Sequence, residues 1–100
     1  MRWLVQTYNY EVLGNYDHYL TCDELPTIEE ARNILLKYKE MKEQIERVSV
    51  GSVVIQIDDT KCYGKADILI HYANISQRNE IERIMGGKTF MGIPVRIKNQ

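Results

Sequence analysis

Two histidines and two cysteines, His18, Cys22, Cys62 and His71, are the side chains of this sequence best suited to bind zinc. Zinc favours four such ligands in a tetrahedron, with bonds of about 2.0 to 2.3 Å. His18 and Cys22 fall on an expected strand, where four residues span roughly 13 Å. One zinc ion cannot bind both side chains without breaking that strand, so we expect no metal site and no cofactor.

Two other motifs suggest phosphate or cation binding. The run Gly86-Gly87-Lys88-Thr89 resembles the end of a phosphate-binding loop, but Glu82 stands where that loop needs a glycine. Asp58-Asp59 could bind a hard cation, yet no third oxygen ligand follows at calcium-loop spacing. We interpret the glycines as the end of a helix and the aspartates as an acidic turn.

Nucleophilic catalysis has little support from the sequence. Cys62 follows Lys61, which can acidify a thiol, but no motif places either histidine as its base. His71 alternates with apolar residues and is interpreted as a structural histidine. We therefore expect no catalytic residues and no enzyme. Two cysteines are too few for a disulfide framework, so we expect free thiols in a reducing compartment.

The composition is that of an ordinary globular domain. The 100 residues are 44% hydrophobic and 27% charged, which fits one domain over residues 1–100. No apolar run reaches the roughly 18 to 20 residues that cross a bilayer. The apolar stretch at the start of the sequence is too short for the core of a signal peptide. We expect a cytoplasmic protein without a membrane segment.

Charge changes sign along the chain although the net charge is only −1. Residues 1–30 contain six acidic residues and one basic residue, whereas residues 61–100 contain seven basic and three acidic residues. Either the fold mixes these segments, or the protein has an acidic and a basic edge that select a partner.

The first half of the chain predicts a hairpin and a helix. Residues 2–12 and 16–22 are expected as strands joined by a turn at Gly14-Asn15, which pairs Tyr10 with Tyr19. The hairpin either extends the main sheet or lies beside it. Thr27 and Glu30 form a capping box that begins one helix ending near Arg47. Its apolar stripe is Ile28, Ala31, Leu35, Tyr38, Met41 and Ile45.

The second half predicts three strands and a short helix. Residues 48–57 and 66–73 are expected as strands, and residues 95–98 as a final strand after a turn at 90–94. Asn74 or Ser76 caps the helix between them, and Gly86-Gly87 ends it. The order ββαββαβ predicts an α+β, two-layer ferredoxin-like sandwich. Two helices would cover one face of a mostly antiparallel sheet.

Part of the chain resembles the RNA-recognition motif. Residues 65–72 align with that family's third strand, where Tyr72 matches the last aromatic, but Asp67 and Leu69 replace the residues that stack on bases. Residues 81–97 resemble the end of the motif, with one extra residue in the helix. The similarity supports the fold, since turn glycines and core periodicity make up most of it.

The predicted function is protein binding through the tyrosine-rich acidic hairpin. Tyrosine is enriched at interface hot spots, although it is also an ordinary strand residue. The candidate interface residues are Tyr8, Tyr10, Tyr16, Asp17 and Tyr19. The chain would then be a non-catalytic binding module that contacts a protein or a second copy. An accessory or inhibitory role, as in phage or mobile elements, follows from size alone.

The alternative function is binding of RNA or single-stranded nucleic acid on a basic, open sheet face. Its candidate residues are Lys65, His71, Tyr72, Arg96 and Lys98. This alternative predicts affinity that falls steeply with salt.

Overall fold

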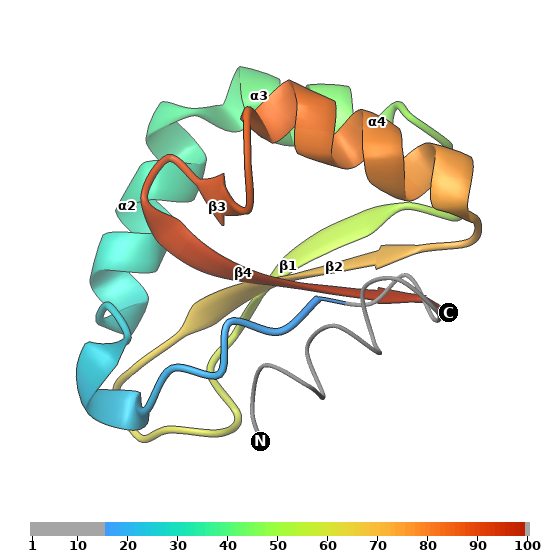
Figure 1. The fold of residues 1–100 in the computed structure, drawn as a ribbon. Coiled ribbons are helices and arrows are strands. Elements are labelled where there is room, and N and C mark those ends of the chain that lie inside the picture. Colours follow the sequence, from blue (N-terminus) through green and yellow to red (C-terminus); the bar gives the residue numbers. More distant parts are fainter. Residues whose placement is uncertain (1–15, 100) are drawn as a thin grey trace.

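The structure, a computed structural model, describes residues 16–99 (Figure 1). The expected strand over residues 2–12 and the turn at Gly14-Asn15, with Tyr8 and Tyr10, lie outside the described residues. The described elements begin with a 3-10 helix, η2, and continue with three α-helices and four strands. They are η2 (Cys22–Glu24), α2 (Ile28–Lys37), α3 (Lys39–Glu46), β1 (Val54–Asp58), β2 (Asp67–Tyr72), α4 (Ile75–Met85), β3 (Thr89–Phe90) and β4 (Ile93–Asn99).

The four strands form one mixed sheet in the order β1-β2-β4-β3. β1 runs antiparallel to β2, β2 runs parallel to β4, and β3 returns antiparallel on the outer side of β4. The three α-helices lie on one side of this sheet, and residues 17–21 run on its other side (Figure 1). The sheet therefore has a helix-covered face and a second face that the described residues before η2 approach.

Alternation along the strands decides which residues enter the core. Ile68, Ile70 and Tyr72 in β2 point toward the helices and are completely buried. Their neighbours Asp67, Leu69 and His71 point to the opposite face. The expected apolar stripe of the first helix does pack on the core: Ala31, Leu35 and Ile45 are buried, and Ile28, Tyr38 and Met41 are partly buried.

The helix expected over residues 28–47 is two helices. Its start is confirmed, because the Thr27 side chain accepts from the Glu30 N–H and the Glu30 carboxylate accepts from the Thr27 N–H. The helix breaks at Tyr38, whose backbone (φ −112°, ψ 38°) leaves the helical region. The break turns α3 toward α4, so both helices cover the sheet. Asn74, not Ser76, caps α4, and the left-handed Gly86 ends it as expected.

The expected ferredoxin-like fold is wrong. It required two helices, a mostly antiparallel sheet and a strand of the first hairpin inserted between the strands here named β2 and β4. In the described chain only one residue of the expected hairpin joins the sheet. This residue is Tyr16, which bridges Ile97 at the outer side of β4. With nothing inserted, β2 and β4 pair directly and in parallel, and α4 makes the crossover between them.

Two expected strands also differ from the structure. Residues 17–21 form no strand, and the chain enters η2 at Cys22. The expected strand over residues 48–57 begins only at Val54, because residues 49–52 form a turn with Gly51 at φ 87°. Glycine adopts this left-handed conformation without steric cost.

Candidate functional site: a buried ion cluster and the segment it anchors

Arg96 is the centre of a buried group of charges at the sheet's helix-free face. Its Nε donates to Asp67 Oδ2 at 2.7 Å and its Nη2 donates to Asp67 Oδ1 at 3.1 Å, which makes a two-pronged ion pair. Nη2 also donates to Asp58 on β1. Arg96 is only 2% exposed and Asp67 only 4%. The three side chains therefore join β1, β2 and β4 in a setting of weak solvent screening.

The two carboxylates stay ionised because of these contacts. Burial raises the pKa of Asp58, but hydrogen bonds from Thr60 and Arg96 outweigh burial and lower it to about 2. Burial likewise raises the pKa of Asp67, and hydrogen bonds from His18 and Arg96 bring it below its ordinary value. Burial lowers the pKa of Arg96, whereas Asp67 and Asp58 raise it above its ordinary value.

His18 extends this group from the N-terminal chain. Its Nε2 lies 2.7 Å from Asp67 Oδ2, and the Leu20 backbone N–H donates to its Nδ1 at 2.9 Å. A backbone N–H can only donate, so Nδ1 carries no proton and Nε2 holds the proton that it donates to Asp67. Both ring nitrogens are therefore occupied. We call His18, Asp58, Asp67 and Arg96 the Arg96 cluster.

The chain around His18 is held in a fixed shape, and we call residues 16–20 the anchored segment. Tyr16 exchanges two backbone hydrogen bonds of 2.8 Å with Ile97. The Tyr19 N–H donates to Asp17 Oδ1 at 2.8 Å, and Tyr19 adopts a left-handed backbone with φ 54°. An aromatic residue rarely adopts this conformation, which persists only where the surroundings impose it. Here the imposing contacts are the bridge to Ile97 and the bond to Asp67.

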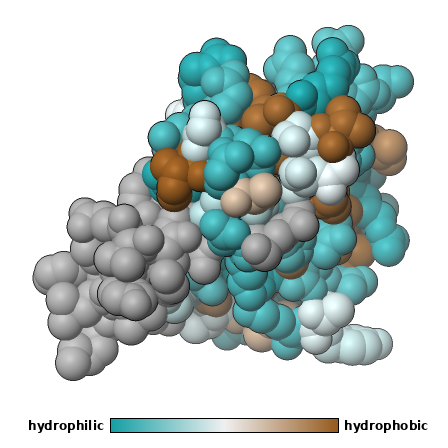
Figure 2. All heavy atoms as spheres, turned by 90° about the vertical axis from the view of Figure 1, so that its right-hand side faces the viewer, coloured by the Kyte–Doolittle hydropathy of each residue, from teal (hydrophilic) through white to brown (hydrophobic). Residues whose placement is uncertain are grey.

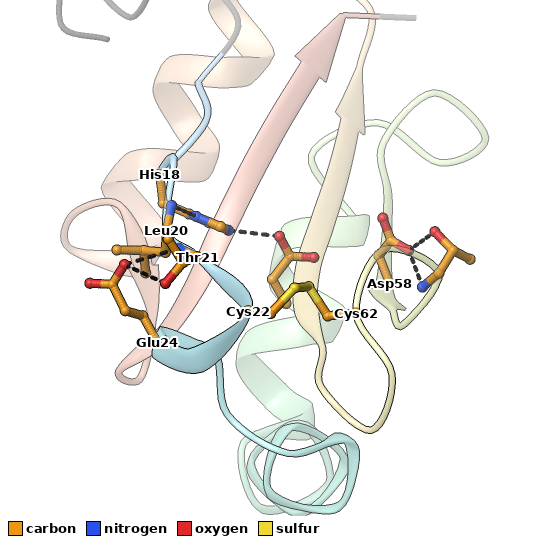
Figure 3. Close-up of a disulfide and its surroundings, with 9 residues drawn as sticks. His18, Leu20, Thr21, Cys22, Glu24, Asp58 and Cys62 are labelled. Carbon is orange, nitrogen blue, oxygen red and sulfur yellow. Dashed lines mark hydrogen bonds and ion pairs between the residues drawn. A yellow bond between two sulfur atoms is a disulfide. The ribbon is translucent and has the colours of Figure 1, made fainter.

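A disulfide between Cys22 and Cys62 closes the end of this region (Figure 3). It joins η2 to the loop between β1 and β2, across 40 residues of sequence and a Cα–Cα distance of 5.6 Å. The expectation of free thiols is therefore wrong. Two cysteines at this separation carry no local geometric signal, since only the path of η2 past the loop brings them together.

A pocket of about 290 Å³ opens beside the cluster. Lys61 and Lys65 line it from the loop, and Asp17, Tyr19 and Leu20 line it from the anchored segment. The pocket combines charges of both signs, and its histidine, His18, has both ring nitrogens engaged. Such an arrangement can hold polar groups by charge and hydrogen bonding, whereas proton transfer would first require His18 to give up a bond.

Three of the five residues expected to contact a protein are described, and they lie together. Tyr16, Asp17 and Tyr19 all belong to the anchored segment and are half-buried. The Tyr16 ring lies 5.5 Å from Lys88 Nζ, a cation–π contact with the turn between α4 and β3. The Asp17 carboxylate supports the Tyr19 turn. The structure therefore gives these residues local structural roles, and the contact with a protein stays a prediction.

The five residues of the nucleic-acid alternative do not share one open face. His71 and Lys98 are paired in register on the helix-free face, and Lys98 is exposed. Tyr72 points to the opposite face and is completely buried in the core, and Arg96 is buried in its cluster. Lys65 lies in the loop, where it bridges Thr27. Two of the five side chains are thus withheld from a ligand.

The sequence contains a signal for the ion pair of Asp67 and Arg96 that no catalytic motif carries, whereas Asp58, expected in an acidic turn, ends β1 and pairs with Arg96. Asp67 and Arg96 each interrupt an apolar run, Ala66-Asp67-Ile68 and Val95-Arg96-Ile97. Charged residues in buried strands are almost always paired. Opposite charges in the two most apolar strands therefore indicate an ion pair. No comparable pattern in the sequence indicates that His18 joins these charges.

Among residues 16–99, no three His, Cys, Asp or Glu side chains converge to hold a metal ion. No helix within that range is long and apolar enough to span a membrane. No protein-family model matches the sequence, and no curated protein and no solved structure matches it significantly.

Replacing Arg96 with Met should lower the free energy of unfolding at pH 7 by about 3–5 kcal/mol, because two carboxylates would remain buried without their partner. Lys98→Met is the matched control, since Lys98 is exposed on the same face of β4. It should change stability by less than about 0.5 kcal/mol. Urea unfolding measures both. Equal losses in the two variants would contradict the structural role of Arg96.

The wild-type protein should lose stability as the pH falls from about 4 toward about 2. Asp58 and Asp67 have pKa values lowered by folding, so their contribution is complete above the ordinary carboxyl pKa of 3.8 and disappears as they gain protons. Asp58→Asn removes one of these groups and should make the loss shallower. Urea unfolding at several pH values measures this loss of stability. An equally steep loss in Asp58→Asn would contradict the lowered pKa of Asp58 as its cause.

Reducing the disulfide should lower the free energy of unfolding by about 4 kcal/mol in the chain-entropy view, because the loop it closes spans 40 residues. The double variant Cys22→Ala/Cys62→Ala should be as stable as the reduced wild-type protein, and a reductant should not change its stability. Urea unfolding with and without a phosphine reductant measures this. A wild-type stability unchanged by reduction would contradict the bond.

Proposed function

We propose that this protein is a non-catalytic binding module that recognises a protein partner through the anchored segment. The observation that carries the proposal is the way this segment is held. Residues 16–20 have no regular structure beyond one bridge, yet Ile97 and Asp67 hold them on the sheet and the disulfide fixes the chain that follows.

A fixed segment favours binding because its shape need not be ordered by the partner. Immobilising a side chain at an interface costs about 0.5–1.5 kcal/mol, and preorganisation reduces that cost. Tyr16 and Tyr19 supply large aromatic surfaces with a polar tip, the type of side chain enriched at hot spots. Tyr8 and Tyr10 belong to the same proposal by sequence alone.

The hydrogen bonding of His18 supports a non-catalytic role. A general base needs a free ring nitrogen, and both nitrogens of His18 are engaged by Leu20 and Asp67. The two cysteines are joined to each other, so neither is a thiolate nucleophile. Binding is therefore the activity that these groups favour.

The face of the molecule drawn in Figure 2 offers less to a partner. On the face drawn in Figure 2, apolar side chains of the described residues stand in separate small groups among hydrophilic ones. A protein-binding patch is usually continuous and larger. This distribution favours the anchored segment over that face as the surface that binds a partner.

The nucleic-acid alternative and the cytoplasmic location have weaker support. Lys98 and His71 form a small polar area on the helix-free face, but Arg96 and Tyr72 are buried. Disulfides persist mainly in oxidising compartments, so the Cys22–Cys62 bond argues against a cytoplasmic location. An accessory or inhibitory role remains a proposal from size alone.

Replacing Tyr19 with Gly tests the proposal. Glycine adopts the left-handed backbone of this position freely, so the variant keeps the shape of the segment and loses only the aromatic side chain. Capture of the partner from source lysate, after nuclease treatment, should fall at least about tenfold, the effect of a hot-spot residue. Quantitative mass spectrometry measures the captured protein.

Tyr63→Ala is the matched control, because Tyr63 is exposed in the loop between β1 and β2 and lies outside the segment. Its capture of the partner should equal that of the wild type, and thermal unfolding confirms that both variants fold. Equal capture by Tyr19→Gly and wild type would reject the anchored segment. Partners that all vanish after nuclease would instead favour nucleic-acid binding.

A further inference from the structure

Asn74, Ile75 and Ser76 form an Asn-x-Ser triplet, which is the acceptor pattern for N-linked glycans. The pattern requires an asparagine, any residue except proline, and then a serine or threonine. None of the other asparagines in the sequence is followed two residues later by serine or threonine. Because the pattern is short, its use depends on where the fold places it and on the compartment that the chain enters.

The fold places this triplet on the surface, in the turn that leads from β2 into α4 (Figure 1). The side chains of all three residues are exposed, and Ile75 is 46% exposed although it is apolar. A glycan is bulky and hydrophilic, so its acceptor must lie where the chain meets water. The turn meets this requirement, and a glycan on Asn74 would shield the neighbouring Ile75 side chain.

The hydrogen bonding of Asn74 leaves its amide nitrogen available. Asn74 caps α4, because its Oδ1 accepts from the Gln77 N–H at 3.0 Å. An asparagine amide has an acceptor oxygen and a separate donor nitrogen. The cap uses only the oxygen, and within residues 16–99 no hydrogen bond engages Nδ2. A sugar bonded to Nδ2 would therefore leave the cap in place.

The Ser76 hydroxyl is also available. Asn74 caps α4, so Ser76 is not needed to begin the helix. Its side chain is exposed, and no hydrogen bond to it is found in the part of the chain that the structure describes. Both side chains that the pattern requires are thus accessible at the same turn.

The disulfide is a second observation, independent of the triplet. The Cys22–Cys62 bond joins η2 to the loop between β1 and β2, away from the turn that contains Asn74. Disulfides persist in secreted proteins and in the compartments through which they pass. N-linked glycans are added to proteins of the same class. The bond and the exposed triplet therefore indicate the same compartment.

We propose that Asn74 is the acceptor of an N-linked glycan, with a lipid diphosphate-linked oligosaccharide as the donor. Nδ2 of Asn74 forms a bond to C1 of the first sugar, and the bond from C1 to the diphosphate oxygen breaks. The lipid diphosphate leaves with the electron pair of that bond, and Nδ2 gives up one proton. No atom is oxidised or reduced, so the donor is the only co-reactant.

Mass spectrometry of the full chain purified from its source tests the proposal. The intact mass should exceed the 11.8 kDa of the chain by the mass of a glycan. Treatment with a peptide N-glycosidase should remove this added mass and convert Asn74 to aspartate, which sequencing of the peptide locates. An unmodified Asn74 in the protein from its source would overturn the proposal.

Variants produced in the same source test the role of the triplet. Ser76→Ala removes the hydroxyl but keeps the Asn74 cap, so this variant should fold and lose the glycan. Ser76→Thr preserves the pattern and should keep the glycan. Asn33→Gln is the matched control, because it replaces an exposed asparagine of α2 outside any triplet and should keep the glycan. Thermal unfolding confirms that each variant folds.

A glycan retained by Ser76→Ala, or lost in Asn33→Gln, would contradict the assignment of the acceptor. Neither Asn74 nor Ser76 belongs to the anchored segment. Partner capture by Tyr19→Gly is measured separately, so the two proposals can fail independently.

Discussion

Arg96 places a permanent positive charge where water hardly reaches, and the rest of the structure is arranged to compensate it. An unpaired charge at that position would be very costly, so two carboxylates must accompany it. Asp58 comes from β1 and Asp67 from β2, which ties three strands together at one end of the sheet. Because Asp67 retains a further lone pair, it also binds His18 and brings the N-terminal chain onto the helix-free face.

The anchored segment is a consequence of this arrangement. His18 can bind Asp67 only if the chain passes over the sheet, and the Tyr16 bridge and the disulfide fix it on either side. The same path keeps the N-terminal chain at the outer side of β4 in the described residues, so β2 and β4 are free to pair in parallel. One constraint therefore explains both the mixed sheet and the fixed shape of residues 16–20. The proposed binding function uses that shape.

Sequence patterns predicted the local elements better than their arrangement. The capping box at Thr27, the end of α4 at Gly86 and the apolar stripe of the first helix depend on neighbouring residues, and all three are confirmed. The sheet order depends on whether a strand is inserted between β2 and β4, which no local pattern encodes. Tyr72 could have been assigned to the core, because it alternates with His71 along one strand. The Cys22–Cys62 bond could not, since 40 residues separate its ends.

The protonation of His18 gives the most direct test of this account. We expect that at neutral pH Nδ1 carries no proton, because it accepts from the Leu20 N–H, and that Nε2 carries the proton donated to Asp67. Long-range ¹H–¹⁵N spectra of the labelled protein distinguish the two nitrogens. A single Nε2-protonated form that becomes mixed in Asp67→Asn would support the account. A proton on Nδ1, or two tautomers exchanging as in free histidine, would contradict it.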